Sequence, residues 1–466
     1  MIVSPRLVPP SPEVLSMLYM DYRKYGKPEG VSFKRYLRII GYVDPSRNVV
    51  GMDDGATIEV EPTGPKLISV PAQQIIGELQ VKVLLVDFDD RIGVLSADYY
   101  RDMLFSDGIY PTGSMRDYYS EVSLGKVKVT GLVHGWLRMP NPYSYYTNGE
   151  SGTKWDSYPQ NAPRLAEDAV KAALNAGVEF PDALDKLSQG VVTALFIVHA
   201  GRGAEVMPPA LRGQEIWSHK WQLRNPVKVS AKLQAALYLV VPNDCQVGVC
   251  AHELGHLAFQ WEDFYDPNYD EDGNEWDGSG KWDLMAGGSY NGNGARPAHP
   301  AGLHKSQHRW VEVEEVRSNA SISLKPYSAN SGKVVKIISP NFKPKQYILL
   351  ENRKKSGFDF DLPGEGLLVW RVDESQMQTG SDEPALLLVQ ADGKHQLETP
   401  SDWNEGDAGD PFPGSENVSL LLDSGSISTS FPSQVKSKVS LKNIKRDSQT
   451  GEITLEVVFD VPKDKK

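Results

Sequence analysis

The chain has 466 residues, 40% of them hydrophobic and 24% charged, which is typical of a globular protein with more than one domain. It carries 49 lysines and arginines against 61 aspartates and glutamates, and the net charge of −12 argues against nucleic-acid binding through phosphate contacts. No apolar run approaches the roughly 18–20 residues that cross a bilayer, so we expect no membrane span. The only two cysteines, Cys245 and Cys250, exclude a fold held by a disulfide framework.

The N-terminal segment, residues 1–76, combines one predicted helix with turn-rich chain. The pattern of Pro12–Tyr25 predicts an amphipathic helix, and stretches rich in glycine and proline follow it. The first residues lack a basic start, a continuous apolar stretch and a small-residue cleavage site. No secretory signal peptide is therefore visible in this chain.

Residues 77–312 have the pattern of a domain that mixes helices and strands. Alternating and then continuous apolar residues predict a strand over 79–88, and apolar runs at 191–198 and 235–241 predict central strands. A helix is predicted over 161–175. This combination indicates an α+β fold with a mixed sheet.

Residues 313–466 are predicted to form a β-rich C-terminal domain. Short runs of β-type residues alternate with proline, glycine, asparagine and aspartate, which favours strands packed as a sandwich or an elaborated sheet. The predicted strands cover 334–338, 346–351, 366–372, 385–389 and 453–459.

The most specific motif is His252-Glu253-Leu254-Gly255-His256. On a helix, two histidines four residues apart lie on one face, so their imidazoles can bind one cation. Glu253 would lie beside that metal without binding it, in a position to hold and deprotonate a metal-bound water. The upstream turn and the apolar residues around the motif support a helix here.

Catalytic zinc usually takes three protein ligands, and the histidine motif supplies only two. The third ligand therefore has to come from elsewhere in the sequence. Glu262 and Asp263 lie ten and eleven residues past His252, where a chain that turns back after the helix returns a ligand. The glycine usual at that turn is replaced by Phe259. Glu275 is the alternative in which a second helix supplies a glutamate, but the glycines around it disfavour a helix.

Met285 is a second landmark, about thirty residues past His252 in the glycine-rich stretch 280–290. A tight turn containing methionine lies beneath the metal in metzincins and accompanies the extended histidine motif. Met285 would give the imidazoles a hydrophobic floor. This landmark favours the scheme with a carboxylate just after the helix.

Together these motifs resemble the zinc metalloproteases of the immune inhibitor A type. The resemblance covers roughly residues 77–415 and is carried by 113–123, 199–219, 250–266, 282–292, 349–353 and 366–370. It implies that 77–312 is a metzincin-like catalytic domain with an active-site helix. It also implies endopeptidase activity on proteins or peptides, an N-terminal pro-segment, calcium binding and an extracellular location. The family's Asp-x-Tyr-Asp sequence aligns with Asp263–Asp266, which favours Asp263 over Glu262 as the third ligand.

These observations predict a zinc-dependent endopeptidase. Zinc held by His252, His256 and Asp263 would activate a water for which Glu253 is the general base. Tyr290, His299 and His219 are candidates for an assisting group. The alternative is a non-catalytic metal-binding adhesion or scaffolding module, although such a module would not need Glu253.

The acidic stretch 262–283 separately predicts calcium binding. It contains nine acidic residues and a single lysine. Asn268, Asp270 and Asp272 have the spacing of the first three ligands of a calcium loop, but Ser279 replaces its final glutamate. Asp266 and Asp277 are the further candidate ligands, which could complete a different cage. The stretch 405–410 could hold a second ion. Cys245 and Cys250 are close enough in sequence for a disulfide, and both redox states are compatible with the sequence.

Overall fold

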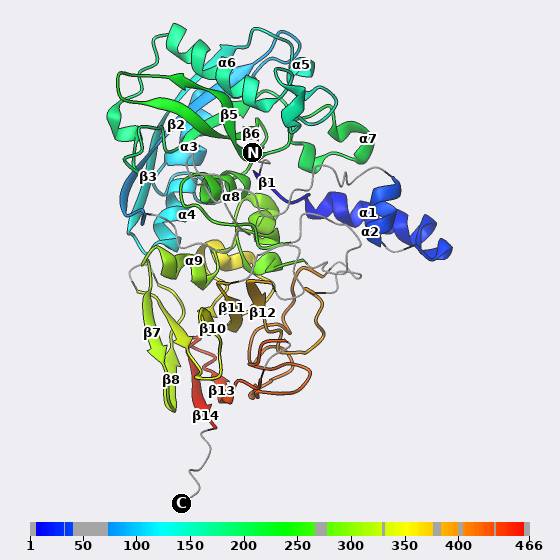
Figure 1. The fold of residues 1–466 in the computed structure, drawn as a ribbon, viewed down its shortest axis with the longest axis vertical. Coiled ribbons are helices and arrows are strands. Elements are labelled where there is room, and N and C mark those ends of the chain that lie inside the picture. The colour runs from blue at the N-terminus through cyan, green and yellow to red at the C-terminus, as the bar shows by residue number, and fades with distance from the viewer. Residues whose placement is uncertain are drawn as a thin grey trace, which may run out of the picture.

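The computed structural model describes residues 6–31, 33–40, 73–265, 277–328, 331–375, 384–398, 404–432 and 435–460. Within these ranges the protein is α+β, as predicted (Figure 1). A large sheet with helices on both faces lies at one end, two smaller sheets lie at the other, and α8 and α9 lie between them (Figure 1). A search of the described helices finds none with the length and apolar character needed to cross a membrane.

The helices and strands follow one another in a mixed order along the chain. The α-helices are α1 (Pro12–Tyr25), α2 (Phe33–Ile39), α3 (Ala97–Phe105), α4 (Met115–Val122), α5 (Tyr143–Thr147), α6 (Ala162–Asn175), α7 (Pro209–Arg212), α8 (Val247–Leu257) and α9 (Gly302–Gln307). The strands are β1 (Arg6–Leu7), β2 (Gly77–Asp87), β3 (Val127–Arg138), β4 (Leu195–His199), β5 (His219–Lys228), β6 (Gln234–Pro242), β7 (Glu312–Val316), β8 (Ala320–Leu324), β9 (Lys333–Ile337), β10 (Gln346–Arg353), β11 (Gly366–Asp373), β12 (Leu386–Leu388), β13 (Val439–Arg446) and β14 (Ile453–Phe459). Short 3-10 helices include η5 (Ala204–Val206), η6 (Gly280–Trp282), η7 (Gly287–Gly294) and η8 (Gly357–Asp361).

The large sheet has six strands in the order β1-β5-β6-β4-β2-β3. Strands β3, β2, β4 and β6 run parallel, whereas β5 is antiparallel to β6 and β1 is antiparallel to β5. The predicted strands at 79–88 and 235–241 are confirmed. The apolar run 191–198 becomes a strand only from Leu195, because the preceding Thr193 donates its backbone N–H to Leu184 outside the sheet.

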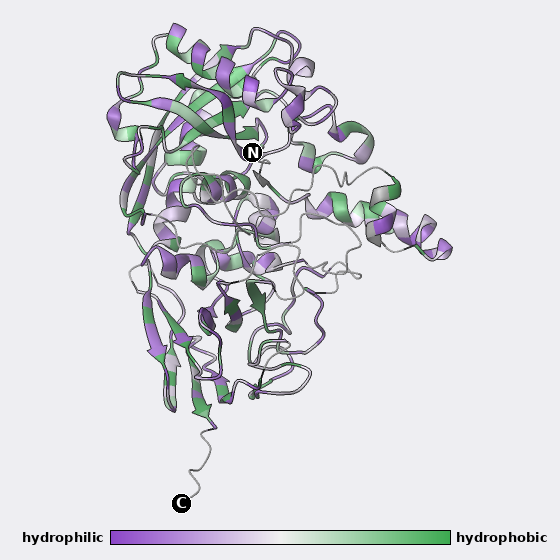
Figure 2. Ribbon diagram, viewed as in Figure 1, coloured by the Kyte–Doolittle hydropathy of each residue, from purple (hydrophilic) through white to green (hydrophobic). Residues whose placement is uncertain are grey.

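Side chains alternate between the two faces of this sheet, so each face has its own core. In β4, Phe196 and Val198 pack into the core that contains α3, α4 and α8, whereas Leu195 and Ile197 pack against α5 and α6. Helix α6 confirms the prediction for 161–175, with Asn161 as its N-cap. Hydrophobic and hydrophilic residues alternate along α1 and α6, as expected of helices with one solvent-exposed face (Figure 2).

The N-terminal segment lies against the exposed edge of the large sheet. Helix α1 has the predicted bounds, begins at an Ser11 N-cap and packs with α2 around a small cluster that includes Leu15 and Leu18. Before it, Arg6 pairs with Lys220 and Leu7 with His219, so β1 extends the sheet beyond β5. The part of this segment between residues 41 and 72 lies outside the described residues.

The C-terminal region is a sandwich of two sheets, one with the order β12-β11-β10-β9-β7 and one with the order β13-β14-β8. In β10, Ile348 and Leu350 pack into the core between these two sheets. Leu349, between them, packs into the core that also contains α8. The five-stranded sheet therefore shares one of its faces with the helix that carries the histidine motif.

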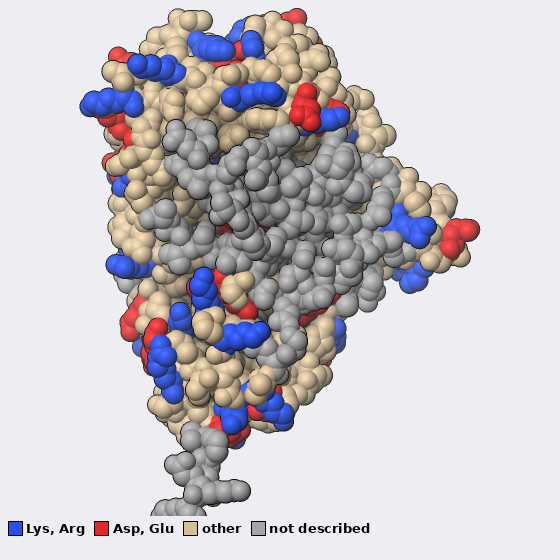
Figure 3. Space-filling model, viewed as in Figure 1, with Lys and Arg blue, Asp and Glu red and all other residues tan. Residues whose placement is uncertain are grey.

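Charged side chains of both signs lie next to one another on the part of the surface that Figure 3 shows for the described residues. Within the described chain, several of them form ion pairs, such as Lys333 with Glu314 and Arg317 with Glu315. Exposed pairs of this kind contribute little to stability, about 0–1 kcal/mol each, so the fold depends mainly on its cores.

We expect Leu349→Ala to lower the free energy of unfolding by about 2–5 kcal/mol, because it creates a cavity in the shared core. Urea unfolding followed by far-UV circular dichroism measures this change. Val313→Ala is the control, since Val313 is 39% exposed on β7, and we expect it to change stability by less than about 0.5 kcal/mol. Equal effects of the two substitutions would contradict the shared core.

Candidate metal centre

Helix α8 begins four residues after β6 and is buried on all sides. Gln246 is its N-cap, and Cys245 and Cys250 lie at the positions where a hydrophobic staple forms between the preceding chain and the first turn. Both cysteines are free thiols whose Sγ atoms lie 3.5 Å apart. The two cysteine side chains are therefore in contact with one another.

Two glycines let α8 pack closely against the chain that follows it. A Cβ on Gly248 would lie 1.9 Å from the carbonyl oxygen of Ser289, and one on Gly255 would lie 3.0 Å from Sδ of Met285. Neither position could carry a larger side chain without movement of its neighbour. Gly255 lies inside the histidine motif, so Met285 packs closely against this part of the motif.

His252, His256 and Asp263 bring three ligand atoms together. Nε2 of His252 and Nε2 of His256 lie 3.0 Å apart, and Oδ1 of Asp263 lies 3.3 Å from the first and 3.0 Å from the second. Atoms bound to one tetrahedral zinc at about 2.0–2.1 Å are separated by about 3.3 Å. All three residues are buried, and the spacing suits a shared metal ion.

Backbone acceptors fix the orientation of both imidazoles. Nδ1 of His252 lies 2.9 Å from the Leu284 carbonyl oxygen, and Nδ1 of His256 lies 2.7 Å from the Trp261 carbonyl oxygen. A carbonyl only accepts, so each Nδ1 carries the proton and each Nε2 of a neutral ring presents a lone pair. Three acceptor atoms then face one another, an arrangement that a cation stabilises.

The chain turns back between the helix and Asp263 without a glycine. Phe259 occupies the expected glycine position and stacks on Tyr119, with ring centroids 4.8 Å apart. The left-handed conformation is adopted one residue later, by Gln260 at φ 60°. The Trp261 N–H then donates to the Gly255 carbonyl, which closes the turn. The shift by one residue explains why the usual glycine is missing.

Glu253 and Asp263 are buried carboxylates with opposite electrostatic surroundings. Burial raises the pKa of Glu253 well above its usual value, and the nearby Asp263 and Glu205 raise it further. Among the residues that the structure describes, neither carboxylate oxygen of Glu253 has a hydrogen-bond partner. Burial opposes ionisation of Asp263, whereas protonation of the two adjacent imidazoles would lower the pKa of that carboxyl below its usual range. Asp263 is thus suited to bind a cation, and Glu253 to hold a proton.

Helix α4 also supports the centre from outside the motif. Ser114 and Asp117 form a capping box at its start, and the Tyr119 hydroxyl donates to the Ala251 carbonyl at 2.7 Å. Tyr118 likewise donates to the Ala298 carbonyl at 2.7 Å. The sequence stretch 113–123 therefore reaches helix α8 and the chain that follows Met285.

The comparisons with known proteins agree with this geometry. Residues 88–315 match the family model described as the immune inhibitor A peptidase M6 catalytic domain. Pre-pro-metalloprotease PrtV of Vibrio cholerae serotype O1 is 29% identical over 263 residues, covering 49% of this chain and 28% of the relative. Immune inhibitor A of Bacillus thuringiensis subsp. alesti is 29% identical over 272 residues, covering 49% of this chain and 39% of the relative.

Residues 88–315, just under half of the chain, are thus similar to the catalytic domain of the M6 peptidase family. The resemblance to immune inhibitor A inferred from the sequence is thereby confirmed. The aligned part spans less than two fifths of the length of either relative. The M6 match ends at residue 315, close to the start of the five-stranded sheet.

Other predicted site residues lie elsewhere. Glu262 is 6% exposed but is not part of the cluster of His252, His256 and Asp263. Asp266, Asp270, Asp272 and the alternative ligand Glu275 lie outside the described residues. Asp277 is described and donates its backbone N–H to the Leu397 carbonyl. A further carboxylate cluster joins Asp407 and Asp410 of the predicted stretch 405–410 to Asp392, which sequence reasoning missed.

The three candidate assisting groups have other partners. His219 hydrogen-bonds Tyr238 through Nε2 and the Trp217 carbonyl through Nδ1. His299 contacts Glu121 at 2.8 Å and Lys305 at 2.9 Å. Tyr290 donates to the Pro9 carbonyl at 2.6 Å, so its hydroxyl contacts the N-terminal segment.

We expect Asp263→Ala to weaken zinc binding by more than about 100-fold, since it removes a direct ligand where outer-shell changes alone cost about 10–100-fold. Metal analysis after dialysis against a graded chelator measures the change. Glu262→Ala, the adjacent carboxylate, is the matched control and should keep about one zinc per chain. The reverse result would assign the third ligand to Glu262.

Proposed function

We propose that this chain is a zinc-dependent endopeptidase that hydrolyses peptide bonds in protein or peptide substrates. The observation that supports this proposal is the distance between the three ligand atoms. The Nε2 atoms of the two Nδ1-protonated imidazoles and Oδ1 of Asp263 lie within 3.3 Å of one another. His252, His256 and Asp263 would hold the metal. Zinc bound there would act as a Lewis acid and lower the pKa of a water toward about 7.

Glu253 is proposed as the general base and acid. Its carboxylate would take the proton from the attacking water at one oxygen and deliver it to the amine nitrogen of the leaving peptide. A raised pKa suits both steps, because the group must hold the proton between them. Burial of Glu253 also excludes bulk water that would otherwise compete for this proton.

We expect Glu253→Gln to keep bound zinc but to reduce casein hydrolysis by about 10²–10⁴-fold, because a glutamine cannot accept the proton. Initial rates and metal content would be measured on the same preparation. Full activity in this variant would contradict the role of Glu253. A wild-type chain that binds zinc but cleaves no substrate would favour the metal-binding adhesion or scaffolding module.

We propose residues 1–76 as a pro-segment, of which β1 pairs with β5 at the edge of the large sheet. An extended peptide can be held by pairing with an exposed strand, and β1 already pairs with β5 in this way. Val8 donates its N–H to the Ser218 carbonyl at 3.2 Å, and Ser11 donates to the Glu205 carbonyl at 3.0 Å. The Trp217 indole donates to the Val8 carbonyl at 2.8 Å.

We expect Trp217→Phe to raise the hydrolysis rate of the full chain about 2–10-fold, because loss of one hydrogen bond of about 0.5–1.5 kcal/mol weakens the docked segment. Rates on a fluorogenic peptide library would show it. The same substitution should have no effect once residues 1–76 have been removed. An equal increase in both forms would contradict the pro-segment.

The remaining assignments rest on the resemblance and the sequence. We propose 77–312 as the catalytic domain and 313–466 as a β-rich domain joined to it through the shared core. Calcium binding near the acidic stretch and an extracellular site of action stay predictions.

A further inference from the structure

Arg353, the last residue of β10, is fully buried and lies beyond the part of the chain that matches the M6 family. Its guanidinium binds Asp359 through two hydrogen bonds, Nε to Oδ2 at 2.7 Å and Nη2 to Oδ1 at 2.6 Å. Glu351 lies 3.5 Å from Nη1. A buried charge is retained where it is paired in this way, but pairing alone does not explain the remaining contacts.

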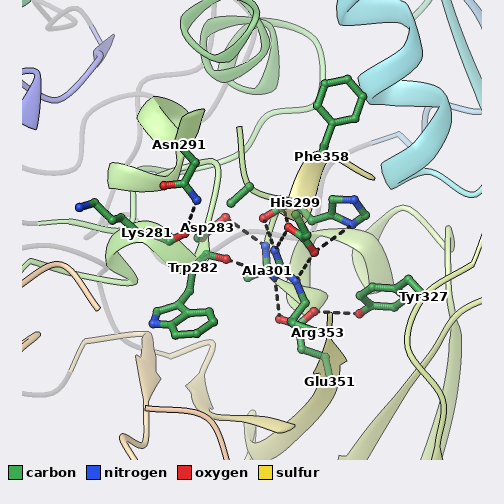
Figure 4. Close-up of polar contacts among 12 residues, drawn as sticks. Lys281, Trp282, Asp283, Asn291, His299, Ala301, Tyr327, Glu351, Arg353 and Phe358 are labelled. Carbon is green, nitrogen blue, oxygen red and sulfur yellow. Dashed lines mark hydrogen bonds and ion pairs between the residues drawn. The ribbon is translucent and has the colours of Figure 1, made fainter. Parts of the chain in front are cut away.

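The other donors of Arg353 reach backbone carbonyls near Met285 (Figure 4). Nη1 donates to the Trp282 carbonyl at 3.1 Å, and Nη2 donates to the His299 carbonyl at 3.3 Å. The same His299 carbonyl accepts the backbone N–H of Leu284 at 3.3 Å. Arg353 thus binds the segment 282–285 directly at the Trp282 carbonyl. It also reaches Leu284 indirectly, because both residues donate to the His299 carbonyl.

Leu284 connects this network to the metal centre, because its carbonyl accepts the Nδ1 proton of His252. Asp283 completes the support, since its Oδ1 accepts the N–H groups of Met285 at 3.2 Å and Ala301 at 3.0 Å. The path from Arg353 to His252 therefore consists of two carbonyl groups and the Leu284 peptide. It contains no flexible side chain between them.

We infer that Arg353 is a positioning residue for the metal centre. It fixes the Leu284 carbonyl, which in turn fixes the tautomer and orientation of the His252 ring. The C-terminal sheet thereby supplies part of the metal centre, although the M6 match ends before it. This inference rests on the proposed function only in that His252 binds zinc.

The substitution Arg353→Lys tests whether the hydrogen bonds of Arg353, rather than its positive charge alone, position the metal centre. A lysine keeps the positive charge beside Asp359 and Glu351, but its single ammonium cannot pair with Asp359 twice and also reach two carbonyls. We expect the variant to fold with wild-type circular dichroism and to raise the zinc Kd about tenfold in competition with a chromophoric chelator. The visible absorption bands of the Co²⁺-substituted chain should shift, since they report ligand geometry.

Arg446→Lys is the matched control. Arg446 lies on β13 of the same C-terminal region and pairs with Glu365, away from the segment 282–285. We expect a zinc Kd within twofold of wild type and unchanged Co²⁺ bands for this variant.

A folded Arg353→Lys chain with wild-type zinc Kd and Co²⁺ bands would overturn the inference. Should that variant not fold, Asp359→Asn decides, because it removes the paired charge and loosens the guanidinium while Arg353 stays in place. A raised zinc Kd would then support the inference, and a wild-type Kd would overturn it. A wild-type chain without zinc affinity would instead refute the proposed function, and the inference with it.

Discussion

The rest of the structure depends on one constraint at the metal centre. Two imidazoles and a carboxylate are held so that their lone pairs point toward one another. The Nδ1 protons of His252 and His256 are already bound to the Leu284 and Trp261 carbonyls. Neither ring can turn its proton inward without losing a buried hydrogen bond. The centre is therefore preorganised for a cation, and the surrounding elements keep these two carbonyls in place.

Those carbonyls come from two different stretches of chain, and each is supported by its own neighbours. The Trp261 carbonyl is fixed by the turn at Gln260 and by the stacked rings of Phe259 and Trp261. The Leu284 carbonyl is fixed by the network around Asp283 and by the contacts that reach it from β10. The elements that orient the two histidines thus extend from α4 to the C-terminal sheet.

The sequence predicted the parts of the centre that follow from local spacing. Two histidines four residues apart define a helix face, and the family motif pointed to Asp263, which the structure places against both rings. The left-handed Gln260 was not predictable, because it requires a departure from the usual glycine position that only packing around Phe259 explains. The contacts of Arg353 with the Trp282 and His299 carbonyls were missed because these carbonyls lie 71 and 54 residues away in sequence. Asp392 was missed because it lies outside the stretch 405–410.

Burial also explains which strands could be predicted from the sequence and which could not. The strands β4 and β6 are buried on both faces and read as continuous apolar runs. Strand β5 was missed, because from Arg224 onward it is mostly exposed and it contains Pro226. Strand β1 pairs with β5 at His219 and Lys220, in the buried first half of the strand, so the half that the sequence failed to predict is not the half that binds the N-terminal segment.

The alternation of side chains along β10 has a consequence for how this architecture can vary. Leu349 packs in the core that also contains residues of α8 and α9, while Ile348 and Leu350 pack between the two sheets of the sandwich. An exchange of the C-terminal region between related chains would have to preserve the first set of contacts but could replace the second freely. The outer layer of the sandwich is therefore free to diverge, whereas the strand beneath it must evolve together with the active-site helix.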